Sequence, residues 1–226
     1  MGFLKRILRN NLKQEESSES ARGSFETLSH EELQTHMGIR SYGAFDLTDA
    51  VRPSYDLQVV PKQGFRFDQY VDETSGSSTP AIMAAVTRHQ LLDLFFELID
   101  VLGPVVDVVL ESSHRVQDSH KDHYREHIDT AVLKSILLEF EDLLLNDGCT
   151  GIAVINPQKR QEVQLDEHKL LVMYGRPLDK FVTTLIQEDV YPDKNIQFIT
   201  EAEHVHSSSE KMHDQFNILK NRLGID

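Results

Sequence analysis

Short runs of β-branched residues alternate with longer stretches of helical periodicity over residues 79–226, and this alternation strongly constrains the fold. The runs VVDVVL (105–110) and TGIAVI (150–155) are bounded by turn-forming or small residues and have the length and composition of buried strands. Around them, apolar residues recur at three- and four-residue spacing, as in amphipathic helices. The pattern predicts an α/β (α+β) fold, with a mixed, partly antiparallel sheet of about five strands packed by helices.

Local start and stop signals give the boundaries of the elements expected in this domain. Thr79-Pro80 is a capping residue followed by proline at the first helical position, and Asp147-Gly148 is typical of a helix end. Asp166-Glu167 separates two apolar runs, as in a β-hairpin. In chain order, the expected elements are a helix over 79–103, a strand over 105–110, a long helix over 118–146, strands over 150–155, 161–165 and 168–174, a helix over 177–188, a strand over 196–199 and a helix over 209–223.

The chain before this domain is less regular. Residues 14–78 are rich in Ser, Glu, Gly, Pro and Asp, and we expect them to form a linker and an irregular arm. Within the arm, Ser29 and Glu32 have the spacing of a capping box, which predicts a short helix ending at Met37. Residues 79–226 are expected to form a single α/β domain. Short extended pieces are expected in the arm at 55–60 and 65–71.

The first thirteen residues have the pattern of a basic amphipathic helix. Their apolar residues share one helical face, and the segment carries four cations and no acid. The apolar positions are Phe3, Leu4, Ile7, Leu8 and Leu12, and the cations are Lys5, Arg6, Arg9 and Lys13. Such a helix packs on the acidic body of its own protein, docks onto a partner, or makes weak contact with an anionic membrane surface. In the membrane alternative, the contact runs through Phe3, Leu4, Ile7 and Leu8.

The charge balance and the cysteine content exclude some functions. The formal net charge is −14, and since residues 1–13 carry +4, the remainder carries −18. An acidic surface repels the phosphate backbone, so we expect no nucleic-acid binding. The single cysteine cannot form an intramolecular disulfide, and no apolar run reaches the roughly eighteen residues that span a bilayer. These features predict a cytoplasmic protein.

Residues 123–127, His-Tyr-Arg-Glu-His, resemble the signature of the inverted zinc proteases. On a helix, His123 and His127 would share one face and could bind one zinc ion, with Glu126 as general base. The resemblance implies a third ligand downstream, for which Glu203 or Glu201 is the candidate. The local sequence is strongly polar, however, and the resemblance covers only these residues. An exposed first turn of the long helix is therefore the preferred interpretation, and an adventitious or structural metal site that includes His114 or His120 is a further alternative.

Other side-chain combinations are also weaker as sites than as ordinary structure. Asp107 and Glu111 share a strand face near His114, as paired carboxylates do in cation sites, but also as in a polar sheet edge. His204 and His206 alternate on an extended segment and point the same way, a geometry that metals use. An exposed strand end is the other interpretation. Cys149 is expected to be a small buried residue rather than a nucleophile.

No phosphate-binding glycine loop and no nucleophile elbow occur in the sequence. We therefore expect a non-enzymatic protein-interaction or regulatory module without a cofactor, acting through a protein partner or through self-association as a homo-oligomer. The alternative is a zinc hydrolase that uses His123, Glu126 and His127.

Overall fold

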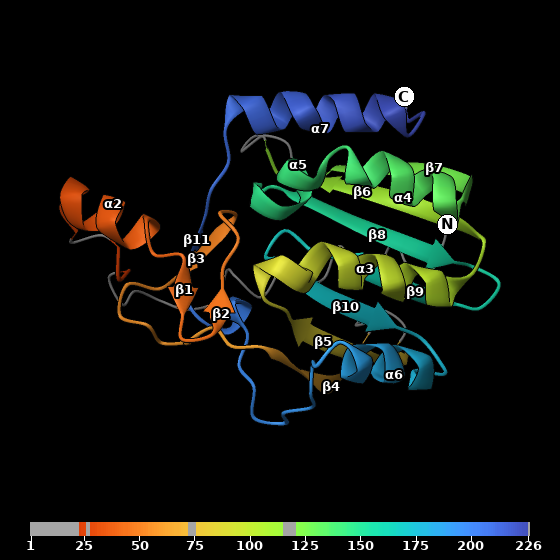
Figure 1. The fold of residues 1–226 in the computed structure, drawn as a ribbon, viewed down its shortest axis with the longest axis horizontal. Coiled ribbons are helices and arrows are strands. Elements are labelled where there is room, and N and C mark those ends of the chain that lie inside the picture. The colour runs from red at the N-terminus through yellow and green to blue at the C-terminus, as the bar shows by residue number, and fades with distance from the viewer. Residues whose placement is uncertain (1–22, 26–27, 72–75, 115–120, 226) are drawn as a thin grey trace.

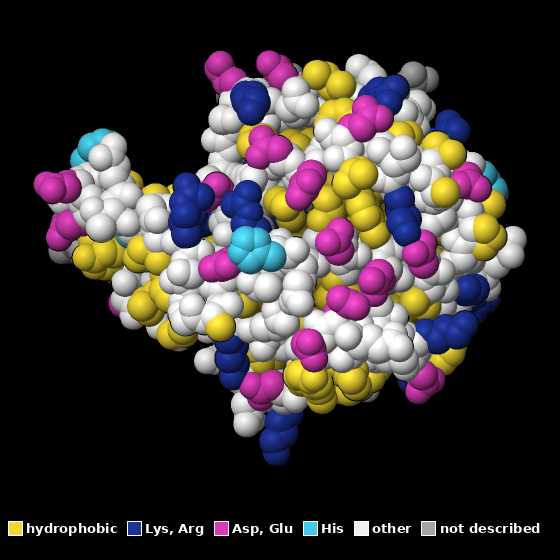
Figure 2. Space-filling view, viewed as in Figure 1, with side chains coloured by type: hydrophobic (Ala, Val, Ile, Leu, Met, Phe, Trp, Pro, Cys, Tyr) yellow, Lys and Arg dark blue, Asp and Glu magenta, His cyan; other side chains and the backbone are white. Residues whose placement is uncertain are grey.

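The computed structural model describes residues 23–25, 28–71, 76–114 and 121–225 (Figure 1). The expected N-terminal helix at 1–13 and most of the linker after it lie outside these residues. In the described part of the chain, no helix has both the length and the apolar character needed to cross a bilayer. Figure 2 shows acidic and basic side chains spread over one face of the molecule, with a small lobe projecting at one side.

A seven-stranded sheet forms the centre of the fold, and every strand pair in it is antiparallel. The strand order is β4-β5-β10-β9-β8-β6-β7, so β4 and β7 are the edges. The strands are β4 (Gly64–Val71), β5 (Ser78–Ala85), β6 (Val105–Ser112), β7 (Lys121–Asp129), β8 (Thr150–Asn156), β9 (Gln161–Leu165) and β10 (Leu170–Tyr174). The α+β class is confirmed, and the sheet has more strands than the five expected.

Among the described residues, five helices pack on one face of this sheet (Figure 1). They are α3 (Arg88–Leu102), α4 (Thr130–Leu138), α5 (Glu141–Asn146), α6 (Asp179–Gln187) and α7 (Glu210–Arg222). Their apolar faces share one buried cluster with alternate strand residues such as Val108, Val154 and Leu171. Because successive strand residues point to opposite faces, the intervening residues lie on the second face of the sheet.

The arm forms the projecting lobe and is joined to the core by a two-stranded ribbon (Figures 1 and 2). It contains α2 (His30–Met37), β1 (Ser41–Tyr42), β2 (Phe45–Asp46) and β3 (Val51–Pro53). β3 pairs antiparallel with β11 (His204–His206), which follows a 3-10 turn, η2 (Ile199–Glu201). The arm is therefore tied to a segment from near the C-terminus of the chain.

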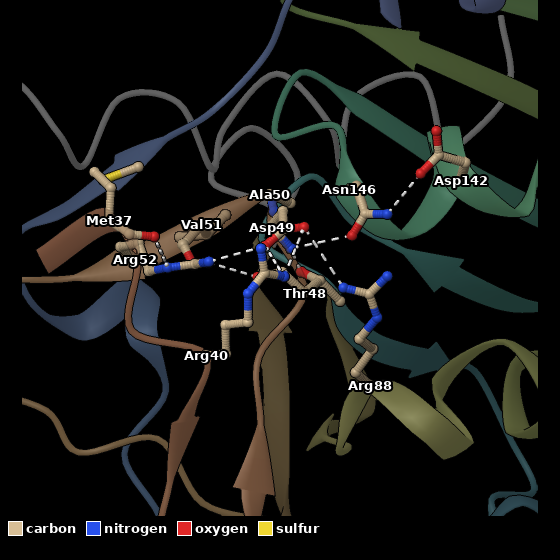
Figure 3. Close-up of polar contacts among 10 residues, drawn as sticks. All are labelled: Met37, Arg40, Thr48, Asp49, Ala50, Val51, Arg52, Arg88, Asp142 and Asn146. Carbon is tan, nitrogen blue, oxygen red and sulfur yellow. Dashed lines mark hydrogen bonds and ion pairs between the residues drawn. The ribbon is translucent and has the colours of Figure 1, made fainter. Parts of the chain in front are cut away.

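A buried arginine holds the base of the arm together (Figure 3). Arg52 is 2% exposed and donates hydrogen bonds to the carbonyl oxygens of Met37, Thr48 and Val51. It also pairs with Asp49 at 3.0 Å, and the backbone N–H of Asp49 donates to Asn146 of α5 at 3.1 Å. The planar guanidinium can satisfy these oxygens together, which connects α2, β3 and the helical layer.

Several expected elements are confirmed. The capping box at Ser29 and Glu32 starts α2, and the hairpin around Asp166-Glu167 joins β9 to β10. The closing helix is present as α7, with Phe216 and Leu219 buried. The strand expectations at 65–71, 105–110 and 150–155 and the helix expectation at 177–188 are also confirmed, as β4, β6, β8 and α6.

The largest error concerns the helix expected over 118–146. Residues 121–129 form the edge strand β7, and α4 begins only at Thr130. The side chain of Asp129 caps α4 by accepting from the backbone N–H groups of Ala131 and Val132. Pairing with β6 decides this conformation, because an exposed edge strand carries polar residues that local periodicity does not identify as strand.

Three smaller expectations are also wrong. Residues 78–85 form β5 rather than the start of a helix. Pro80 has no backbone N–H to donate, but its carbonyl oxygen accepts from the N–H of Gly175, directly after β10, at 3.1 Å. Residues 196–198 are irregular and lead into η2, which begins at Ile199, and 55–60 form turns and bends. The main sheet also takes in β4, from the segment assigned to the arm.

Candidate metal centre

The β9–β10 turn presents the first histidine of a cluster. Asp166 organises this turn, because its backbone N–H donates to the carbonyl of Leu170 and its Oδ1 accepts from the Leu170 N–H at 2.8 Å. Its other carboxylate oxygen lies 3.0 Å from Nδ1 of His168. The next residue, Lys169, has a φ of 64°, an uncommon conformation for a residue with a side chain.

Lys169 is anchored beneath the turn. Its side chain is 6% exposed, and its ammonium donates to the carbonyl of Thr150 at 2.8 Å. Burial lowers the pKa of Lys169 to about 8, against the opposing effect of neighbouring acids. The buried contact keeps Lys169 in its left-handed conformation and thereby holds His168 at the surface of the turn.

β11 supplies the other two histidines. His204 and His206 are two residues apart on a strand, so their side chains point to the same side. Nδ1 of His204 lies 2.9 Å from the carbonyl oxygen of Ala202, and Nδ1 of His206 lies 2.5 Å from that of Gly148. Since a carbonyl oxygen can only accept, both rings donate from Nδ1.

Gly148 allows β11 to approach the core at this point. A Cβ atom on Gly148 would lie 2.4 Å from the carbonyl oxygen of Ala50 and 3.0 Å from Cβ of His206. The backbone N–H of Gly148 donates to the carbonyl of Ser207 at 2.7 Å, next to the contact with His206. A residue with a side chain would push β11 away from the core and His206 away from the cluster.

The three rings converge. Their centroids are 4.9 Å apart for His168 and His204, 4.7 Å for His168 and His206, and 5.0 Å for His204 and His206. One ligand nitrogen from each ring lies within 4.8 Å of the other two. Tetrahedral zinc, with Zn–N bonds of about 2.0–2.1 Å, places ligand nitrogens roughly 3.3 Å apart, so each ring would move by less than about 1 Å to bind.

The hydrogen bonds fix which nitrogen is suited to a metal. Each ring has an oxygen acceptor at Nδ1, a carboxylate for His168 and carbonyls for His204 and His206. A ring that donates from Nδ1 carries its lone pair on Nε2, which is the arrangement found around metal-binding histidines. Burial, with His168 and His204 nearby, lowers the pKa of His206 and favours the neutral imidazole that a metal requires.

The residues of the inverted zinc-protease hypothesis are not brought together. They lie on β7, where the pairing with β6 shifts register between Val106 and Val108, so the regular alternation of side chains is interrupted between His123 and His127. His123 packs on Phe216 of α7, with ring centroids 5.8 Å apart, while the backbone N–H of His127 donates to Asp107. Residues 121–129 form a strand and therefore do not provide the helical geometry that the hypothesis requires.

The expected third ligands have other partners. Glu203 accepts from the backbone N–H of Ser24 at 2.7 Å. Glu201 pairs at 2.7 Å with Arg66 of β4, on the edge of the sheet opposite to β7. Neither acid lies beside His123 in the structure.

The other candidate site residues that the structure describes each have a different partner. Nε2 of His114 lies 2.9 Å from Asp147, and His120 falls outside the described residues. Asp107 and Glu111 both lie on β6, but Asp107 binds the His127 N–H and Glu111 accepts from Gln164.

Burial raises the pKa of the Cys149 thiol, which disfavours the thiolate that a nucleophile needs.

The sequence indicated that His204 and His206 share a geometry that metals use, although an ordinary exposed strand end was the preferred interpretation, and it gave no indication of His168. The three residues come together because β11 lies against the start of β8 while the β9–β10 turn reaches the same end of the sheet. A histidine directly after an Asp-Glu turn was the only local signal, and it did not say which strand would lie beside it.

Comparison with protein-family models, with curated proteins and with solved structures finds no match to this chain. The candidate site therefore stands on its geometry and chemistry.

Proposed function

We propose that this protein binds a divalent transition-metal ion of the zinc class through His168, His204 and His206. The observation that carries the proposal is the convergence of three imidazoles, each with its Nδ1 committed to an oxygen acceptor. Three nitrogen ligands suit zinc, nickel, cobalt or copper, whereas magnesium and calcium prefer oxygen ligands.

The proposed role of the ion is to fix the arm on the core. His168 belongs to the central sheet, whereas His204 and His206 belong to β11, the partner strand of β3 in the arm. An ion shared by these residues would restrain the position of α2, which projects from the body (Figure 1). This role agrees with the non-enzymatic interaction or regulatory module expected from the sequence, with a protein partner or a second copy engaging the arm in the cytoplasm.

Metal analysis of full-length protein tests the site. Protein purified without a histidine tag and without chelator, then dialysed against zinc, is expected to hold about one equivalent, as a three-histidine site would. His204→Ala combined with His206→Ala is expected to remove the bound zinc. The matched control is His123→Ala combined with His127→Ala, which removes two histidines of β7 and is expected to leave zinc content unchanged.

Two results would contradict the proposal. Zinc below a tenth of an equivalent in the unaltered protein would exclude a site, and loss of zinc only in the β7 variant would return the metal to the protease-like motif. The role in fixing the arm is tested separately by hydrogen exchange. Zinc is expected to slow exchange at β3 and β11, and equal exchange with and without zinc would argue against that role.

A further inference from the structure

The two edges of the central sheet differ in how they meet solvent. β7, at one edge, has features that prevent pairing with another chain: five of its nine residues are charged, a register shift interrupts its pairing with β6, and His127 has a φ of 55°. β4, at the opposite edge, lacks these features (Figure 1). Its pairing with β5 is continuous from Gly64 to Val71, and it contains no lysine and no proline. β4 is therefore the edge suited to accept a further strand.

The start of the β4 edge is covered by a segment of the same chain. The backbone N–H of Phe65 donates to the carbonyl of Tyr191 at 3.1 Å, and the carbonyl of Phe65 accepts from the N–H of Asp193 at 2.8 Å. The backbone groups of Phe65 therefore point away from β5. In an antiparallel pair, the backbone groups of successive residues point alternately toward the neighbouring strand and away from it.

Beyond this contact, the outer backbone groups of β4 have no strand beside them. By the same alternation, Phe67, Gln69 and Val71 direct their N–H and C=O groups away from β5. Pro80 of β5 agrees with this, because it lies opposite Gln69 and its carbonyl accepts from Gly175 on the other side of β5. In the described part of the chain, no strand pairs with these three residues of β4 on their outer side.

The side chains of the same three residues are exposed. They lie on one face of the strand, and Phe67 and Val71 are 59% and 53% exposed. The ring of Phe67 packs edge-on against that of Phe65, with centroids 5.8 Å apart, which holds it in place on the strand. A strand added to this edge would therefore cover two apolar side chains and also satisfy a row of backbone groups.

We propose that β4 pairs antiparallel with β4 of a second copy of this chain, about a twofold axis that passes between the two Gln69 residues. In this register, each Phe67 lies opposite the partner's Val71. The central sheets of the two copies then form one continuous sheet, with the helices of both copies on the same side. The surface uses no residue of the histidine cluster, so the inference is independent of the proposed metal site.

The chain itself selects this register. Residues that exchange hydrogen bonds across an antiparallel pair must both direct their backbone groups toward the partner, so Phe67, Gln69 and Val71 must pair among themselves. A register centred on Phe67 would use Phe65, whose backbone is already bonded to Tyr191 and Asp193. A register centred on residue 68 would also use Phe65, and it would place two aspartates opposite each other. The register centred on Gln69 pairs all three residues without Phe65.

The contact between two β4 strands is self-complementary. Two Phe–Val pairs flank a central pair of glutamine amides, each of which can donate and accept, and cross-strand pairs of this kind stabilise antiparallel sheets. Because the contact is isologous, each copy uses its β4 edge once, and the outer edges of the joined sheet are the two β7 strands. Since β7 is protected against pairing, the expected assembly is a closed dimer and not a growing fibre.

Light scattering on full-length protein, separated by size exclusion in the presence of a chelator, tests the proposal. The chelator excludes association through a metal bound by the histidines. The expected mass is twice 25.9 kDa, and it falls toward 25.9 kDa on dilution. Phe67→Lys is expected to raise the dissociation constant at least about tenfold, because it places a charge on the covered edge.

The matched control is Tyr124→Lys, which changes an exposed aromatic residue of the other edge strand and is expected to leave the dissociation constant unchanged. A mass of 25.9 kDa at every concentration would overturn the proposal. Equal dissociation constants for Phe67→Lys and the unaltered protein would also overturn it.

A cysteine crosslink tests the register. In a Cys149→Ser background, Gln69→Cys places two thiols across the twofold axis, where paired Cα atoms are about 5.5 Å apart, within the range that a disulfide spans. Mild oxidation is expected to link the two copies, whereas Tyr124→Cys in the same background is expected to give no linked dimer. Linkage only through Tyr124→Cys would assign the interface to β7. A protein that is dimeric by light scattering but not linked through Gln69→Cys would overturn this register.

Discussion

Glu162 lies on β9, in the middle of the second face of the sheet. Its burial predicts a large effect of its ionisation on the free energy of unfolding. The residue is 2% exposed, and its Oε2 atom has no hydrogen-bond partner among the described residues. Burial raises the pKa of Glu162 to about 8, because a charged carboxylate loses its hydration there. Replacing it with glutamine keeps the shape of the protonated acid and removes the ionisation.

The magnitude follows from linkage. The pKa of Glu162 is higher in the folded protein than in the unfolded chain. Below pH 4.5 the carboxyl group is therefore protonated in both the folded and the unfolded state, and its ionisation does not reduce the stability of the fold. As the pH rises toward 8, the unfolded state releases its proton first and stability falls. With the pKa values of 4.5 and about 8, the loss is about 1 kcal/mol at pH 5 and about 3 kcal/mol at pH 7.

Glu162→Gln is therefore expected to stabilise the protein by about 3 kcal/mol at pH 7 and by about 1 kcal/mol at pH 5. Urea unfolding at the two pH values, followed by circular dichroism, measures both differences. The matched control is Glu126→Gln on β7, where the side chain is exposed and the expected change is within about 0.5 kcal/mol. A gain that is the same at both pH values, or no gain at pH 7, would refute the reasoning.

Three further substitutions probe the base of the arm and the cluster beside it. Gly148→Ala places a Cβ 2.4 Å from the Ala50 carbonyl oxygen. We expect the free energy of unfolding, measured with a chemical denaturant, to fall by about 1–3 kcal/mol and zinc binding to weaken. Normal zinc affinity would contradict the role given to this glycine. Arg52→Ala removes the donor of the buried network and is expected to lower the free energy of unfolding by about 2–4 kcal/mol. The control, Arg40→Ala, changes a side chain that is 70% exposed and is expected to lower it by less than about 1 kcal/mol. Equal losses for the two variants in thermal unfolding would be evidence against a buried anchor. Burial alone would raise the pKa of Asp147, but hydrogen bonds from His114, Ser208 and Thr150 hold it below its ordinary value, so its stabilisation is present above pH 3.8 and is lost as the pH falls through the lowered pKa. Asp147→Asn is expected to cost about 2 kcal/mol at pH 7 and progressively less in acid, and a cost that does not change with pH would contradict this account.

Most of the core was predictable because each element satisfies its own local rules. The runs at 105–110 and 150–155 are β-branched and bounded by turn formers, and the helix at 210–222 has an amphipathic period with a serine cap. The hairpin around Asp166-Glu167 is similarly local. In these segments, burial in the tertiary structure favours the same conformation that the local sequence prefers.

Residues 121–129 were predicted wrongly for a physical reason. An edge strand meets solvent and bonds to only one neighbour, so it carries few apolar residues and gives little periodic signal. The polar sequence before Ile128 is compatible with the first turn of a helix, and only its pairing with β6 decides otherwise. The same misassignment created the protease-like interpretation of His123, Glu126 and His127, because that chemistry depends on a helix.

The sequence by itself determined the class of fold, the helix caps, the hairpin and the same-side placement of His204 and His206. These depend on interactions among residues close along the chain. The tertiary structure alone decided that His168 joins these two histidines and that the second face of the sheet is buried. Both depend on contacts between residues far apart in the chain, such as Gly148 with His206, which local patterns do not encode.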